Sequence, residues 1–87
     1  MEDKEEIGFV FKFFVKPSVA AINITKGELS VGDTINIIGE TTDFSQKIDS
    51  MEIDNVKVDK VAAGSSVGIK VKDRVRSNDK IYKIKTE

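Results

Sequence analysis

The segment Lys26–Gly39, with the sequence KGELSVGDTINIIG, constrains the fold more than any other part of the chain. Glycines suit backbone corners with a positive φ angle, and β-branched residues suit the pleated strand between two such corners. An aspartate beside a glycine typically ties down its own turn through its side chain. The segment therefore predicts the corners of a small β-barrel. The predicted structural turn positions are Gly27, Gly32, Asp33, Gly39 and Gly64.

The rest of the chain repeats this pattern of short strands and turns. Predicted strands cover Ile7–Val15, Val19–Thr25, Thr34–Ile38, Gln46–Ile53, Val56–Val61, Ser66–Val71 and Lys80–Lys85. No stretch of about a dozen residues has helical periodicity. Turn signals that recur about every eight to twelve residues are typical of all-β proteins. We predict an all-β fold, a closed or nearly closed antiparallel barrel of about six to seven strands.

The 87 residues have room for one modest hydrophobic core. We predict a single β-barrel domain at residues 7–85, with a flexible acidic N-terminus at 1–6 and a short C-terminal end at 86–87. In Gln46–Ile53 the apolar residues change face, which predicts a bulge near Asp49-Ser50. Asp54-Asn55 is a turn signal, and Val75 is the expected anchor of the loop Asp73–Asp79.

The first predicted strand, Ile7–Val15, is apolar on both faces. Strict alternation places the side chains of Ile7, Phe9, Phe11, Phe13 and Val15 on one face. Large apolar residues are usually buried, so one interpretation of the phenylalanines is core. In the other, Phe9, Phe11 and Phe13 are exposed and form a patch for self-association, for a partner protein or for stacking bases. The candidate interaction patch comprises Phe9, Phe11, Phe13, Lys12 and Lys16.

The composition argues against catalysis. The chain has no histidine and no cysteine, which excludes an imidazole base, a thiol nucleophile and a disulfide. Acid pairs such as Asp49 and Glu52 alternate with apolar residues, as solvent-facing strand positions do. No GxxxxGK[ST] phosphate loop is present, so no nucleotide is expected. We predict a protein that is not an enzyme, with no cofactor and no metal site.

The start of the chain, MEDKEEIG, lacks the basic residues and the apolar block of a secretory signal. No apolar run is long enough to span a bilayer. We expect a cytoplasmic protein without a membrane partner.

The net charge is −1, but the charged residues are unevenly distributed along the chain. Residues 1–59 carry 6 Lys/Arg against 12 Asp/Glu, whereas residues 60–87 carry 8 against 3. Lysine and arginine clusters bind phosphates, although dedicated RNA-binding domains usually have a higher pI than the value of about 5.5 found here. The candidate RNA-contact residues are Lys70, Lys72, Arg74, Arg76, Lys80 and Lys83.

The order of the parts is similar to a known family. The pattern G-x-L-x-V-G-D-x-I-x-I-x-G at Gly27–Gly39 precedes a second pattern, Ala63-Gly64 followed by Val67-Gly68-Ile69. Together they resemble domain two of translational GTPases such as elongation factor Tu. That resemblance implies a barrel of the translation-factor domain-two type. In the family, this barrel lies beside a nucleotide-binding domain and helps to contact the aminoacyl end of tRNA.

A closer resemblance covers residues 7–85 and rests on the run GETTDFSQKIDSM at Gly39–Met51. This run, with the Ile7-Gly8 opening, resembles the C-terminal barrel of collagenase-like peptidase-family proteins. The resemblance implies an accessory barrel beside a separate catalytic domain, in a family with some members linked to RNA hydroxylation. The nucleotide-binding domain of the first family and the catalytic domain of the second are both absent from these residues.

Two functional hypotheses follow. In the first, the chain is a non-catalytic, translation-factor-like barrel that binds RNA, such as tRNA or ribosomal RNA, or a component of translation or RNA modification. In the second, it is a protein-interaction module. It would act as a detached accessory domain of a collagenase-like enzyme or associate with itself through the first strand, so a monomer and a homodimer both stay open.

Overall fold

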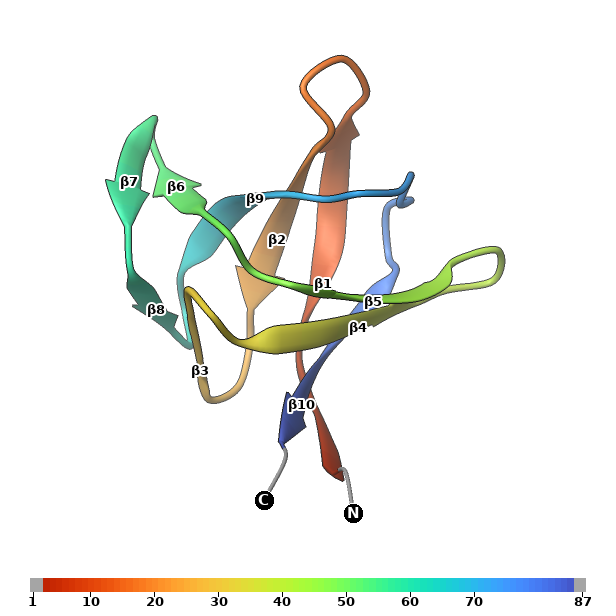
Figure 1. Ribbon diagram of the computed structural model, residues 1–87, viewed down its shortest axis with the longest axis horizontal. Helices are drawn as coiled ribbons and strands as arrows, with labels where there is room; N and C mark the ends of the chain where they lie inside the picture. The colour runs from red at the N-terminus through yellow and green to blue at the C-terminus, as the bar shows by residue number, and fades with distance from the viewer. Residues whose placement is uncertain (1–2, 86–87) are drawn as a thin grey trace.

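The computed structural model describes residues 3–85 and contains only strands and turns over that range (Figure 1). The all-β prediction is confirmed. The number of strands is higher than predicted, because two predicted strands, Gln46–Ile53 and Val56–Val61, each break into two shorter ones, and Glu28–Ser30 forms an additional short strand. The ten strands are β1 (Asp3–Phe14), β2 (Val19–Ile24), β3 (Glu28–Ser30), β4 (Thr34–Ile38), β5 (Asp43–Lys47), β6 (Met51–Ile53), β7 (Val56–Val58), β8 (Lys60–Ala62), β9 (Ser66–Lys70) and β10 (Lys80–Lys85).

Eight of the strands form one antiparallel sheet in the order β5-β4-β10-β1-β2-β9-β6-β7, and β3 pairs with β8 in a small second sheet. The chain passes directly from β5, at one end of the large sheet, to β6 near its other end, so the sheet curls on itself (Figure 1). No backbone ladder joins the two end strands in the described residues. The barrel is therefore nearly closed.

Two boundaries differ from the prediction. β1 begins at Asp3 and not at Ile7, because Lys4, Glu5 and Glu6 continue the pairing with β10. The predicted flexible segment 1–6 is thus strand from residue 3 onward, while residues 1–2 and 86–87 lie outside the described range. The predicted strand Gln46–Ile53 is interrupted at residues 48–50, where an irregularity was expected, and β5 already starts at Asp43.

A bulge in β1 decides which of the phenylalanines face the core. Val10 lies opposite Ile22 and Lys12 lies opposite Ala21, so Phe11 is an extra residue. Before the bulge Val10 points inward and is fully buried; after it, Phe13 points inward and packs against the core. The prediction of a single shared face is wrong, because an extra residue in one strand reverses the alternation beyond it.

The loop before β10 forms hydrogen bonds with the backbone at and next to this bulge. The N–H of Asn78 donates to the carbonyl of Val10 at 2.6 Å, and the N–H of Val10 donates to the carbonyl of Asp79 at 2.8 Å. The hydroxyl of Ser77 donates to the carbonyl of Phe11 at 3.2 Å. Buried backbone groups need such partners, so the bulge and the loop depend on each other.

The core lies inside the curled sheet and is almost entirely aliphatic. Val75 is 1% exposed and anchors the loop after β9, as predicted. The largest fully buried side chains are those of Ile7, Ile22, Ile24, Leu29, Ile35, Ile37, Ile48, Met51, Ile69, Ile81, Val10 and Val75.

The predicted turn positions serve as turns for two different reasons. Gly27, Gly32 and Gly64 have φ angles of 64°, 98° and 95°, which favour glycine. Gly39 lacks such a φ angle; a Cβ atom there would overlap the carboxylate of the buried Asp79.

Side-chain and backbone geometry fix two further turns. The Asp33 carboxylate accepts the N–H of Ser30 at 2.8 Å, and the N–H of Asp33 donates to the carbonyl of Ser30 at 3.0 Å. Asp54 and Asn55 have φ angles of 51° and 67°, as in a two-residue type I′ hairpin turn. Both predicted turns are confirmed.

Candidate interaction surfaces

The described residues offer no arrangement for catalysis by a metal ion. Between residues 3 and 85, no three or more acidic, histidine or cysteine side chains gather closely enough to hold a metal ion. That range also contains no helix with the length and apolar character needed to cross a membrane.

Half of the candidate RNA-contact residues are engaged within the fold. The Lys80 ammonium lies 3.5 Å from the carboxylate of Glu6, and the Lys83 ammonium lies 3.3 Å from that of Asp33. Arg76 donates from Nε to the hydroxyl of Thr41 at 2.9 Å. Acidic side chains of β1 and of the turn before β4 thus pair with Lys80 and Lys83.

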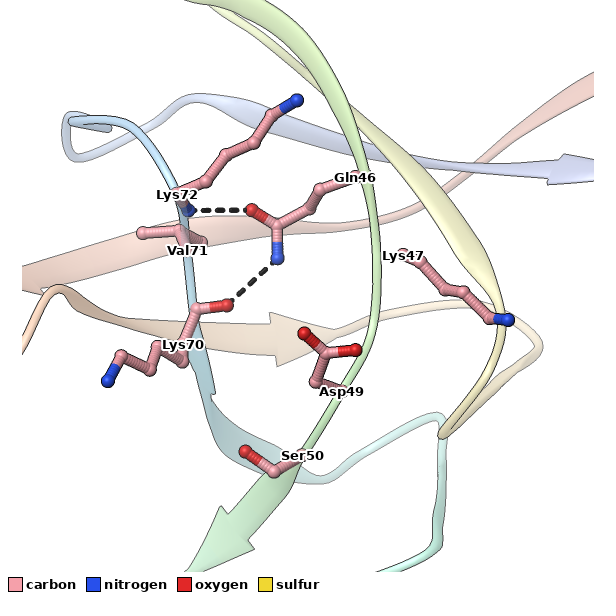
Figure 2. Close-up of a pocket in the computed structure, with 7 residues that line it drawn as sticks. All are labelled: Gln46, Lys47, Asp49, Ser50, Lys70, Val71 and Lys72. Atoms are coloured by element: carbon pink, nitrogen blue, oxygen red, sulfur yellow. Dashed lines mark hydrogen bonds between the residues drawn. The ribbon is translucent and has the colours of Figure 1, made fainter.

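The other three, Lys70, Lys72 and Arg74, are exposed at the end of β9 and just beyond it. The Lys72 ammonium lies 6.0 Å from the ring centroid of Phe44. Figure 2 shows Lys47, Lys70 and Lys72 pointing away from one another around a cleft, with their ammonium groups at its periphery. Lys70 and Lys72 thus point in different directions, and RNA contact by the six residues stays a prediction.

The cleft in Figure 2 has a volume of about 420 Å³ and lies where β6 separates from β9. The side-chain amide of Gln46 spans it. Its Nε2 donates to the carbonyl of Lys70 at 2.8 Å, and its Oε1 accepts the N–H of Lys72 at 2.9 Å. This amide imitates a strand peptide and joins β5 to the segment after β9. Our sequence reasoning missed this role of Gln46, whose only signal was its place in the TTDFSQ run.

A second cavity, of about 400 Å³, lies between the β1–β2 hairpin and the β6–β7 hairpin. We call it the hairpin groove. Phe11 and Phe14, which are 44% and 43% exposed, form one wall. Ile53 and the acidic residues Glu52 and Asp54 form the other wall. Residues with little or no side chain, Ala21 and Gly68, also line the groove.

The predicted interaction patch divides between the core, the sheet surface and this groove. Phe13 packs against the core, and Phe9 is half-buried opposite Lys80 and Asn23 on the neighbouring strands. Phe11 lines the hairpin groove. Lys12 lies beside it, with its ammonium 5.0 Å from the ring centroid of Phe14. Lys16 is exposed at the hairpin tip.

Two sequence relatives cover nearly the whole chain. An uncharacterized protease of Methanocaldococcus jannaschii is 41% identical over 83 residues, which is 94% of this chain and 20% of the relative. A collagenase of Porphyromonas gingivalis is 37% identical over 81 residues, which is 92% of this chain and 22% of the relative. This chain thus spans about a fifth of the length of these relatives and is homologous to one part of them. No family model matches the chain.

Among solved structures, the C-terminal domain of a candidate U32 peptidase from Geobacillus thermoleovorans superimposes with a TM-score of 0.83. The match covers 91% of each chain at 21% sequence identity. The chain has the fold of that C-terminal domain. The collagenase-like resemblance is therefore confirmed at the level of homologous sequence and of fold. The resemblance to domain two of elongation factor Tu finds no support in these comparisons and stays a prediction.

Proposed function

We propose that this chain is a non-catalytic accessory barrel of a collagenase-like or U32 peptidase-like system. The observation that supports this most directly is the extent of the match, which covers 94% and 92% of this chain but only about a fifth of each relative. A protein of the same fold exists as the C-terminal domain of a larger candidate peptidase. The fold alone does not carry the chemistry of such a protein, because chemistry resides in sites.

The described residues support the non-catalytic part of the proposal. They hold no acid cluster for a metal ion, and the chain has no histidine or cysteine. The cleft in Figure 2 is lined by three lysines, an amide and one carboxylate, that of Asp49. The hairpin groove is lined mainly by apolar and small residues, with the carboxylates of Glu52 and Asp54 on one side. In this proposal the larger part of the relatives performs peptide cleavage, and the barrel binds or positions that part.

A domain replacement in the Porphyromonas gingivalis collagenase tests the proposal. Three proteins are compared for degradation of collagen: the intact relative, a form without the matched segment, and a form in which this chain replaces that segment. We expect the replacement to recover most of the activity that the deletion removes, and the isolated chain to have none. A replacement no more active than the deletion would overturn the accessory role.

The control for this experiment is the same replacement carrying Gly8→Val. A Cβ atom at Gly8 would overlap the backbone carbonyl of Asn23 on β2, so this variant disrupts the β1–β2 pairing. We expect it to behave like the deletion. Recovery of activity by Gly8→Val as well would mean that any linker of this length is sufficient.

RNA binding is the second hypothesis, and the observation in its favour is the exposed trio Lys70, Lys72 and Arg74. Filter binding to tRNA and ribosomal RNA at two salt concentrations tests it. Contacts with phosphates predict binding that weakens steeply with salt, and a Lys70→Glu/Lys72→Glu variant that binds more weakly still. Absence of binding near physiological salt would remove this hypothesis.

A further inference from the structure

We propose that the hairpin groove receives the tip of the β1–β2 hairpin from a second copy of this chain, which forms a twofold-symmetric dimer. The proposal does not depend on the accessory function proposed above. It rests on three features of one molecule. The groove is apolar and has acidic residues at its rim, the hairpin tip is rigid and carries an apolar residue followed by a lysine, and the tip lies next to the groove.

The groove offers exposed apolar surface that no other part of the described chain covers. Phe11 and Phe14 leave more than two fifths of their surface in solvent. The Lys12 ammonium lies over the Phe14 ring in a cation–π contact. Gly68 lacks a side chain, and a Cβ there would stand 3.3 Å from Cγ1 of Val19, so the glycine keeps the groove open. Aromatic walls around a concave apolar site are typical of binding surfaces.

The rim of the groove is acidic. Glu52 and Asp54 are exposed, and neither takes part in the ion pairs Lys60–Glu28, Lys80–Glu6 and Lys83–Asp33 of the described side chains. Lys57 lies opposite Glu52 on β7, but the two do not form an ion pair in the structure. The groove is thus suited to an apolar side chain followed by a cationic one.

The tip of the β1–β2 hairpin has this chemistry. Val15 is 66% exposed, the largest exposed fraction among the exposed large hydrophobic residues, and Lys16 follows it directly. The tip is held rigidly. The N–H of Ser18 donates to the carbonyl of Val15 at 3.2 Å, and the N–H of Val71 donates to the carbonyl of Ser18 at 2.8 Å. A preorganised tip loses little conformational entropy on docking.

The positions of tip and groove favour a second copy of this chain as the occupant. Phe14 and Val19 line the groove and also flank the tip, so the groove begins where the tip ends. The fixed hairpin cannot fold back into its own groove. Two copies related by a twofold axis can exchange tips, so that Lys16 of each copy meets Glu52 and Asp54 of the other, as in an isologous interface. Because the contact is small, we expect a dissociation constant on the order of 10–100 μM.

Sedimentation equilibrium of the isolated chain between roughly 10 μM and 1 mM tests the dimer, because this range brackets the expected dissociation constant. We expect reversible dimerisation of the wild type. Val15→Asp, Lys16→Glu and Glu52→Lys should each weaken it by tenfold or more. Far-UV circular dichroism and thermal unfolding establish that each variant is folded, since all three positions are exposed.

Mixing two variants gives the sharpest test. In Lys16→Glu alone an acidic tip meets an acidic groove, and in Glu52→Lys alone a basic tip meets a groove with an added lysine. A mixture of the two variants restores opposite charges at both contacts, so it should form heterodimers with near wild-type affinity. Lys26→Glu and Glu40→Lys, which make the same charge changes at exposed positions away from the groove, serve as matched controls and should dimerise normally.

Several outcomes would overturn the proposal. The first is a wild-type chain that stays monomeric at about 1 mM. The second is a mixture of Lys16→Glu and Glu52→Lys that associates no more strongly than either variant alone. The third is a loss of association in Lys26→Glu or Glu40→Lys as large as that in the test variants. The domain replacement in the collagenase is a separate experiment, because it measures collagen degradation by a covalently joined protein, whereas the dimer is measured on the isolated chain.

Discussion

Replacing Gln46 with alanine removes the side-chain link between β5 and the segment after β9. Two hydrogen bonds are lost. In one, Nε2 of Gln46 donates to the Lys70 carbonyl at 2.8 Å, and in the other, Oε1 of Gln46 accepts the N–H of Lys72 at 2.9 Å. A net contribution of about 0.5–1.5 kcal/mol per bond gives a total of about 1–3 kcal/mol. Lys70 and Lys72 are exposed, so water replaces the lost partners and the lower half of that range applies. We expect the free energy of unfolding to fall by about 1–2 kcal/mol.

Urea unfolding followed by far-UV circular dichroism measures this loss. With an m value of about 1–2 kcal/mol/M, the midpoint should fall by roughly 1 M. Ser45→Ala changes an exposed neighbour on β5 and serves as the control. Gln46→Glu keeps an acceptor for the Lys72 N–H but cannot donate to the Lys70 carbonyl, so its stability should lie between wild type and Gln46→Ala. If Gln46→Ala matched Ser45→Ala within about 0.3 kcal/mol, the link would not stabilise the barrel.

Three further changes separate packing from surface charge. Gly39→Ala should lower the free energy of unfolding in urea by about 1–3 kcal/mol, because the new Cβ atom displaces the Asp79 carboxylate that accepts the N–H of Arg76. An unchanged urea midpoint would contradict this. Val75→Ala should lower the free energy of unfolding by about 2–3 kcal/mol, because buried apolar surface is lost and a cavity is left. A loss below about 1 kcal/mol would mean that the loop does not need this anchor. Lys60→Ala removes the 3.2 Å pair with Glu28, in which both side chains are more than half exposed, and should change the thermal midpoint by no more than its error.

Much of the fold could be predicted because its signals are local. Gly27, Gly32 and Gly64 adopt left-handed φ angles that glycine favours over other residues. Asp33 bonds to a residue only three positions away, and the Asp54-Asn55 turn is formed by the two residues themselves. Features of this kind depend on neighbours in the sequence.

The surfaces could not be predicted, because their signals are distant in sequence. At the bulge, Ser77 and Asn78 of the loop before β10 donate hydrogen bonds to the carbonyls of Phe11 and Val10. Alternation alone could therefore not show that Phe13 is inside while Phe11 is exposed. The basic residues of the C-terminal third are close in sequence, yet Lys80 and Lys83 pair with acids from β1 and from the turn before β4. The sheet order, which places β10 between β4 and β1, brings those acids near.

The two ends of the described chain lie side by side, because Asp3 pairs with Lys85 at the end of the β1–β10 ladder. Both ends leave the barrel at the pole opposite the β1–β2 hairpin tip (Figure 1). A domain with adjacent ends can be inserted into a surface loop of a host protein without forcing the two sides of that loop apart. A host attached in this way would hold the barrel by one pole and present the hairpin tip outward. The same geometry makes the barrel a practical scaffold, with the attachment point and the variable tip separated by the full length of β1.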